Sequence, residues 1–256
     1  MNRNALFSVL AIAAAVGVVF GIYGNFDISL SSQFFDRQSM RFTAGGQPWE
    51  QHSRDAARLI ITAIAVVPGV AVVAKLLLPH RRMFVSGPTA LFMLLAMAIG
   101  PGFVANSMLK EHWHRARPID IKYFGGNDRF TPWWDPRGTC PGNCSFIAGE
   151  PSGAFWTMAV AAVAPPQWQI AAYSAAVIFG IVLGVLRMAA GGHFFTDVVF
   201  AGVFMYLVLW TLHGLIFRWR RTRLDDGTIE RALAWPGETI LRFLSSLTRR
   251  TGRSTD

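Results

Sequence analysis

The chain has 256 residues, of which 52% are hydrophobic and 15% are charged, and its formal net charge is +9. A soluble domain usually has about 25% charged residues, so this composition argues against a soluble protein. The apolar residues form long blocks, and the basic residues stand between and after them. Membrane topology therefore explains the positive charge better than nucleic-acid binding does.

Six apolar blocks approach or reach the length that a membrane-spanning helix requires, which is roughly 20 residues. We therefore predict an all-α, polytopic membrane protein with six transmembrane helices. The fourth helix is the shortest and most polar, and the first is long enough to remain as an anchor rather than be cleaved. The predicted helices cover residues 5–23, 56–78, 87–107, 146–164, 169–189 and 195–217.

The distribution of Lys and Arg orients these helices. One set of loops is basic, and the tail after residue 217 alone contains nine arginines. The opposite loops mix Arg37, Arg41 and Arg54 with acidic residues. The positive-inside rule thus predicts two cytoplasmic termini and a membrane domain over residues 1–217. Residues 218–256 form a basic cytoplasmic tail, which either lies on the inner leaflet as a partly amphipathic helix or is solvated and only enforces topology.

Three polar segments fall on the outer side in this topology. The first holds Lys110, Arg115 and Arg117, with His112 and His114 between them. Clustered cations of this kind neutralise a phosphate, and an arginine can contact two of its oxygens at once. The alternative is a basic flank whose side chains reach the lipid headgroups.

The second segment is a Gly-rich turn that leads into the fourth helix and contains Gly149 and Glu150. Backbone N–H groups at such a helix start bind anions, and an ionisable residue there is a functional candidate. The alternative for Glu150 is a carboxylate favoured only by the helix dipole. We expect Cys140 and Cys144 to form a disulfide, which is permitted outside the cytoplasm; two reduced thiols are the alternative.

The third segment carries Arg187, His193 and Asp197. A spacing of four residues puts His193 and Asp197 on one helical face. A carboxylate on one imidazole nitrogen leaves the other free to attack; the alternative is an isolated interfacial histidine followed by a helix-capping aspartate. Together the segments supply cations, a nucleophile and a proton donor, which suffice for phosphoryl transfer without a metal or cofactor.

At these residues the sequence resembles the type 2 phosphatidic acid phosphatase family, which includes bacterial lipid phosphatases and vanadium haloperoxidases. The family pattern is Lys-x6-Arg-Pro, then Pro-Ser-Gly-His, then Ser-Arg-x5-His-x3-Asp. The first part matches Lys110, Arg117 and Pro118, and the third matches Arg187, His193 and Asp197 with Leu186 in place of Ser. The resemblance covers roughly residues 87–217. It implies phosphate binding by Lys110, Arg117, Arg187 and the Gly149 N–H, with His193 as nucleophile.

The middle part departs from the family pattern and aligns in two ways. Pro151-Ser152-Gly153-Ala154 puts Ala in the place of the family histidine. The alignment that we favour puts Ile147, Ala148 and Glu150 at the Pro, Ser and His positions, because it keeps an ionisable group where the family has its proton donor. Glu150 donates a proton near neutral pH only if burial outweighs the nearby arginines. A good leaving group, such as a diphosphate or an anomeric phosphate, needs less help.

The resemblance therefore implies a lipid phosphatase that acts through a phosphohistidine at the periplasmic face of a bacterial inner membrane. The expected substrates are lipid A 1-phosphate, undecaprenyl diphosphate or phosphatidylglycerol phosphate, so the partners are a phospholipid, isoprenoid or glycolipid phosphate and the membrane, with no nucleic acid. Two rivals remain: a lipid-to-lipid phosphotransferase, and a non-catalytic lipid-binding or transport protein.

Overall fold

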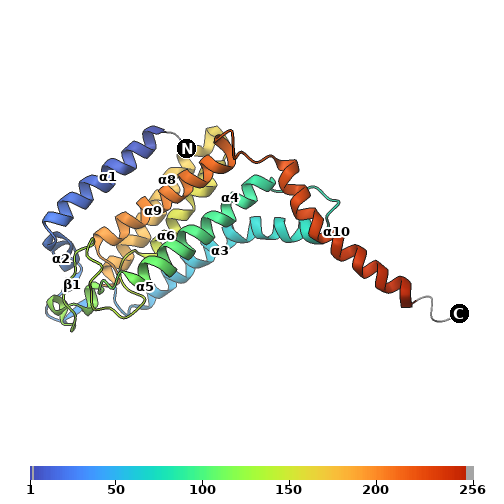
Figure 1. Cartoon of the computed structure of the whole chain (residues 1–256). Helices are drawn as coiled ribbons and strands as arrows, with labels where there is room; N and C mark the ends of the chain where they lie inside the picture. Colours follow the sequence, from blue (N-terminus) through green and yellow to red (C-terminus); the bar gives the residue numbers. More distant parts are fainter. Residues whose placement is uncertain (2, 252–256) are drawn as a thin grey trace. The chain divides into compact units, whose positions relative to one another are not determined.

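A computed structural model describes residue 1 and residues 3–251 of the chain, with side chains up to residue 239. The described chain is mostly helical and has very little sheet, as predicted (Figure 1). It forms two compact units. The first combines Met1–Thr62 with Leu95–Leu212, and the second combines Ala63–Leu94 with the chain from His213 onward.

The first unit contains most of the helices and all of the short strands in the described chain. Strands β1 and β2 pair antiparallel, with Phe35 opposite Phe42. In chain order the elements are α1 (Arg3–Ile22), α2 (Asn25–Ser32), β1 (Phe35–Asp36), β2 (Arg41–Phe42), the start of α3 (Pro48–Leu77), the π-helical η1 (Ala98–Leu109), α5 (Lys110–His112), the 3-10 turns η2 (Pro118–Asp120) and η3 (Lys122–Phe124), α6 (Gly149–Trp156), α7 (Met158–Val163), α8 (Pro166–Ala189) and α9 (Phe195–His213).

Five helical segments of the described chain are long and apolar enough to cross a membrane: Arg3–Ile22, Pro48–Leu77, Gly87–His112, Pro166–Ala189 and Phe195–Arg218. The fourth predicted span is not one helix, since α6 and α7 meet at Thr157. The Thr157 hydroxyl donates to the Ala154 carbonyl at 2.6 Å, a bond that bends helices. Both short helices pack against α8.

Helix α3 begins at Pro48 rather than near residue 56, where the apolar block starts. Proline suits the first position of a helix because its missing N–H has no acceptor there in any case. The earlier start places Glu50, Arg54 and Arg58 on the helix at intervals of four, and therefore on one face.

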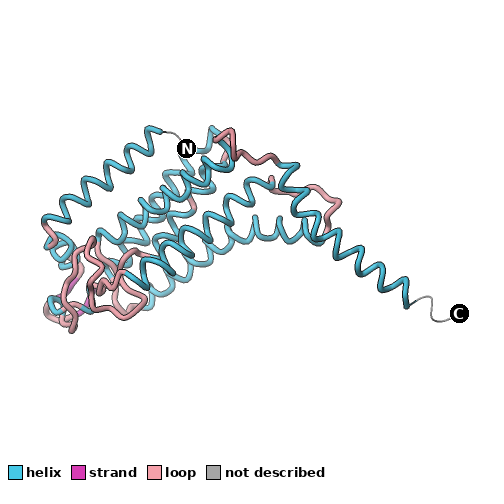
Figure 2. Tube along the Cα trace, viewed as in Figure 1, coloured by secondary structure: helices cyan, strands magenta, loops and turns pink. Residues whose placement is uncertain are grey.

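The loops of the first unit gather at one end of its helices (Figure 2). An aromatic cluster holds them together: Phe35, Phe42 and Phe124 have ring centroids 5.0–5.1 Å apart. The same cluster includes the fully buried Phe194. The β1–β2 hairpin and the loop after Pro118 are thereby packed beside Phe194, the residue that follows His193.

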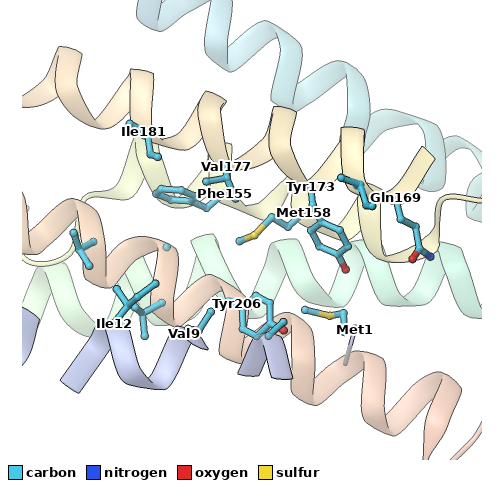
Figure 3. A pocket seen from close by; sticks show the side chains of 15 residues that line it. Met1, Val9, Ile12, Phe155, Met158, Gln169, Tyr173, Val177, Ile181 and Tyr206 are labelled. Carbon is cyan, nitrogen blue, oxygen red and sulfur yellow. The ribbon is translucent and has the colours of Figure 1, made fainter. Parts of the chain in front are cut away.

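A large apolar cavity of about 670 Å³ lies among α1, α6, α7, α8 and α9 (Figure 3). Ile12, Phe155 and Val177 point into it, and the hydroxyl-bearing side chains on its lining are Tyr173 and Tyr206. None of its lining residues is Lys, Arg or His. The cavity suits hydrocarbon and lacks the cations that a phosphate requires.

The second unit contains α4 (Gly87–Met97), η4 (Gly214–Arg218), α10 (Asp226–Thr251) and the later part of α3. Lys75 pairs with Glu230 at 3.0 Å, and the Gly87 N–H donates to Asp226 at 2.6 Å. The start of the basic tail is thus bonded to the helices that precede it. The division at residue 217 and the amphipathic interpretation of the tail stay predictions, and residues 252–256 lie outside the described chain.

Candidate active site

His193 is buried, with 2% of its surface exposed. Its Nδ1 lies 2.8 Å from the Ser145 carbonyl oxygen. Because a carbonyl only accepts, Nδ1 carries the proton and Nε2 is the unprotonated nitrogen. Burial lowers the pKa of His193 well below its usual range, and the charges of Lys110, Arg187 and Arg117 lower it further. The imidazole is thus held neutral, and a neutral imidazole can act as a nucleophile through its unprotonated nitrogen.

The spacing suggested a direct hydrogen bond between Asp197 and His193, but the structure does not have one. Its carboxylate lies 4.0 Å from Nδ1 of His193. It accepts instead from the Ser145 hydroxyl, the Phe194 N–H and the Arg115 guanidinium. These donors occupy the carboxylate oxygens, so Asp197 orients His193 through Ser145.

Arg115 is fully buried, whereas the sequence groups it with Lys110 and Arg117 as a cluster of candidate phosphate-binding cations. Its guanidinium donates to Asp27 at 2.8 Å, to the Thr196 hydroxyl at 2.8 Å and to the Thr131 carbonyl at 2.9 Å, besides its pair with Asp197. A buried charge needs such partners. The network ties α2, which carries Asp27, to the start of α9.

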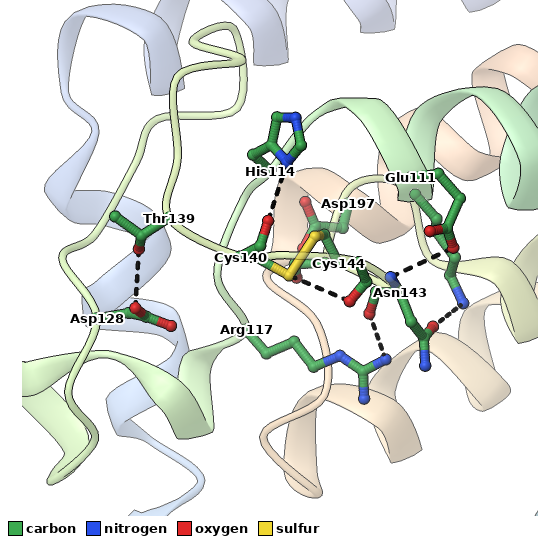
Figure 4. The surroundings of a disulfide bond; sticks show 12 residues. Glu111, His114, Arg117, Asp128, Thr139, Cys140, Asn143, Cys144 and Asp197 are labelled. Carbon is green, nitrogen blue, oxygen red and sulfur yellow. Dashed lines mark hydrogen bonds between the residues drawn. A yellow bond between two sulfur atoms is a disulfide. The ribbon is translucent and has the colours of Figure 1, made fainter.

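Arg117 stands beside the turn closed by a disulfide between Cys140 and Cys144 (Figure 4). Within that turn, Asn143 accepts from Arg117 through its carbonyl at 2.7 Å and from Lys110 through its side chain at 3.4 Å. The disulfide therefore closes the loop that contacts both cations of the first motif.

Gly149 and Gly192 allow the cations to approach the backbone. A Cβ atom on Gly149 would lie 2.8 Å from the Lys110 amine, and one on Gly192 would overlap the guanidinium of Arg187. Glycine is thus required at both positions for this arrangement. Gly149 opens α6 and Gly192 precedes His193, so the three sequence segments meet here.

Glu150 lies among three arginines. Arg54 donates to it at 2.7 and 3.0 Å, Arg58 donates at 2.7 Å, and Arg187 pairs with it at 3.1 Å. Arg187 also donates to Glu50 at 2.7 Å. Arg187 is therefore not a free cation but is held in place between two carboxylates.

These contacts argue against the expected role of Glu150 as proton donor. Opposite charges at hydrogen-bond distance favour the ionised form of a carboxyl group. A carboxylate whose oxygens all accept from guanidinium groups has no proton to give. The geometry assigns Glu150 to the positioning of Arg187 instead.

Sequence reasoning missed several contributors to this site. Glu50, Arg54 and Arg58 were not recognised, although their spacing of four residues is a detectable signal once helix α3 is extended toward Pro48. Asn143 and Ser145 act through contacts that no spacing reveals. Within the described residues, no three His, Cys, Asp or Glu side chains are grouped to hold a metal ion.

Comparison with known proteins gives a consistent result. The PAP2 superfamily model matches residues 89–223. A protein of Francisella tularensis subsp. novicida named lipid A 4'-phosphatase is 32% identical over 224 residues, covering 85% of this chain and 98% of that protein. A protein of the same name from Rhizobium leguminosarum is 29% identical over 197 residues, covering 72% of this chain and 84% of its own. No solved structure matches the chain.

Proposed function

On the premise that this chain belongs to the PAP2 superfamily and is a phosphatase, we propose that it hydrolyses a phosphate ester of lipid A at the outer face of a bacterial inner membrane. One observation carries the proposal. The buried His193 has an unprotonated Nε2 and is surrounded by the charges of Lys110, Arg117 and Arg187. The substrate class comes from the names of the relatives.

The proposed reaction has two steps. Nε2 of His193 attacks phosphorus, the bond from phosphorus to the ester oxygen breaks, and the lipid leaves as an alcohol after taking a proton from water. Water then attacks the phosphohistidine, which releases inorganic phosphate and restores the imidazole. Lys110, Arg117 and Arg187 stabilise the negative charge on the phosphoryl oxygens during both steps.

The position of the phosphate on the sugar separates two forms of this proposal. The names of the relatives favour the 4'-phosphate, which is an ester of an ordinary sugar hydroxyl. The ionised state of Glu150 favours a leaving group that needs no strong acid, such as the anomeric 1-phosphate. We give priority to the 4'-phosphate, since close positioning of three cations is itself a source of leaving-group stabilisation.

The test is a phosphate-release assay with purified protein in detergent micelles. The substrates are lipid A bisphosphate, phosphatidic acid, phosphatidylglycerol phosphate and undecaprenyl diphosphate, and mass spectrometry identifies which lipid A phosphate is lost. We expect loss of the 4'-phosphate and a fall of at least about a thousandfold in the His193→Ala variant. The exposed His112 bonds, within the described chain, only to the Met108 carbonyl, so His112→Ala is the matched control.

Unchanged activity in His193→Ala contradicts the nucleophilic role. Transfer of labelled phosphate to a second lipid, with little free phosphate, indicates the phosphotransferase instead. Binding of lipid A without turnover by wild-type protein supports the non-catalytic rival.

A further inference from the structure

A second cavity opens beside the phosphate-binding residues. Its volume is about 460 Å³, within the range of roughly 300–1,000 Å³ that is usual for small-ligand sites. We call it the outer pocket. It is lined by Phe35, Met40, Arg41, Phe42, Gly45, Gly46, Glu50, Arg54, Ile119, Phe124, Arg187 and Ala190.

The outer pocket shares part of its lining with the candidate active site. Arg187, which contacts both carboxylates of the site, forms part of its wall, as do Glu50 and Arg54. Ala190 stands three residues before His193. A phosphate held by Arg187 therefore has its ester oxygen close to this space, and the pocket is positioned to receive the group that carries the phosphate.

The lining combines apolar faces with hydrogen-bonding groups. Phe35, Phe42 and Phe124 come from the aromatic cluster, whereas Arg41 is exposed and makes no side-chain hydrogen bond or ion pair within the described chain. Charged groups at the wall disfavour an acyl chain, because hydrocarbon would displace their water and offer no hydrogen bonds in return. A sugar ring presents both apolar faces and hydroxyl groups, which match this lining.

We propose that the outer pocket binds the sugar ring of the lipid substrate, with Arg41 donating hydrogen bonds to its hydroxyl or other oxygen-bearing substituents. This inference rests on the proposed phosphatase function and adds the basis of headgroup selection. It predicts that a glycolipid phosphate is preferred over a phospholipid whose phosphate is attached to glycerol, since glycerol leaves most of the pocket empty.

Two variants test the inference from opposite directions. Ile119 is 49% exposed, so Ile119→Trp adds bulk at the pocket wall without replacing a core residue. Arg41→Gln removes the unpaired cation. We measure kcat/KM for lipid A and for phosphatidic acid and expect each variant to lower the ratio between the two at least fivefold. The matched control is Arg37→Gln, because Arg37 is on the same hairpin, donates to Tyr123 and does not line the pocket.

The outcomes separate this inference from the proposed function. If wild-type protein hydrolyses no glycolipid phosphate, the proposed function fails. If it hydrolyses lipid A and neither variant changes the ratio, or Arg37→Gln lowers it equally, the outer pocket does not bind the sugar. Circular dichroism and size-exclusion profiles of the variants verify that each has folded.

Discussion

At the scale of the residue, substitution of Glu150 tests whether this side chain positions Arg187 or donates a proton. Its contacts with Arg54, Arg58 and Arg187 predict that Glu150→Gln releases Arg187 and lowers phosphatase activity about tenfold, which corresponds to about 1.4 kcal/mol. The loss is expected to be equal for a lipid phosphate with an alcohol leaving group and for an aryl phosphate. An aryl phosphate needs no proton donor, so a true general acid would be dispensable for it.

A loss confined to the alcohol leaving group would contradict the positioning role. The control is Asp36→Asn, since Asp36 is an exposed acid whose partners among the described residues are neighbours in its own turn. That variant is expected to retain wild-type activity on both substrates.

The lowered pKa of His193 has a measurable consequence. In the proposed mechanism the neutral imidazole is the attacking form, and protonation at acidic pH removes it. Because burial and three cations depress the pKa below the usual value of about 6.5, the acid limb of the kcat/KM profile is expected below pH 6.5. Arg117→Gln removes one positive charge, which makes protonation easier and moves that limb toward higher pH.

The wild type and the variant are compared on the same substrate, so titration of the substrate phosphate affects both pH profiles equally. Arg37→Gln serves as the control, because Arg37 is not among the charges that lower the pKa of His193 most strongly. An acid limb that stays in place in Arg117→Gln would contradict the electrostatic account of the depressed pKa.

At the scale of the element, the turn between Cys140 and Cys144 supports the cations of the first motif. Replacing both cysteines by serine frees a loop whose closure is worth about 2 kcal/mol in the chain-entropy model. It also loosens Asn143, which contacts Lys110 and Arg117. We expect a lower unfolding temperature and a KM several-fold higher. A reductant should reproduce both changes in the wild type and cause none in the double variant. An unchanged KM would show that the turn does not contribute to substrate binding.

The elements differ in how far they could be predicted from the sequence. Lys110, Arg117 and His193 belong to motifs whose residues lie close together in the chain. Their spacing in the sequence was therefore enough to predict them as site residues. The partners of Asp197 were not predictable in this way, because Ser145 and Arg115 lie far from it in the chain. Arg54 and Arg58, which contact Glu150, were missed for a different reason: the apolar block predicts helix α3 to start near residue 56, whereas its polar first turns begin at Pro48.

At the scale of the whole molecule, the helical membrane class was predictable because long apolar blocks admit few alternatives. The continuity of the fourth span was not predictable. Its break at Thr157 depends on a hydroxyl that bonds to the preceding turn, and hydropathy does not register this contact.

The orientation of the chain in the membrane is a prediction that the whole molecule must satisfy. The positive-inside rule puts the β1–β2 hairpin outside and the loop between α7 and α8 inside. Gln38 is exposed in the hairpin, and Gln167 is exposed in the first turn of α8, directly after that loop, so Gln38→Cys and Gln167→Cys form a matched pair. The native cysteines are joined in a disulfide and do not react with maleimides. In spheroplasts, an impermeant maleimide should label Gln38→Cys and should label Gln167→Cys only after detergent is added. The reverse pattern would place His193 on the cytoplasmic side and would exclude a periplasmic phosphatase.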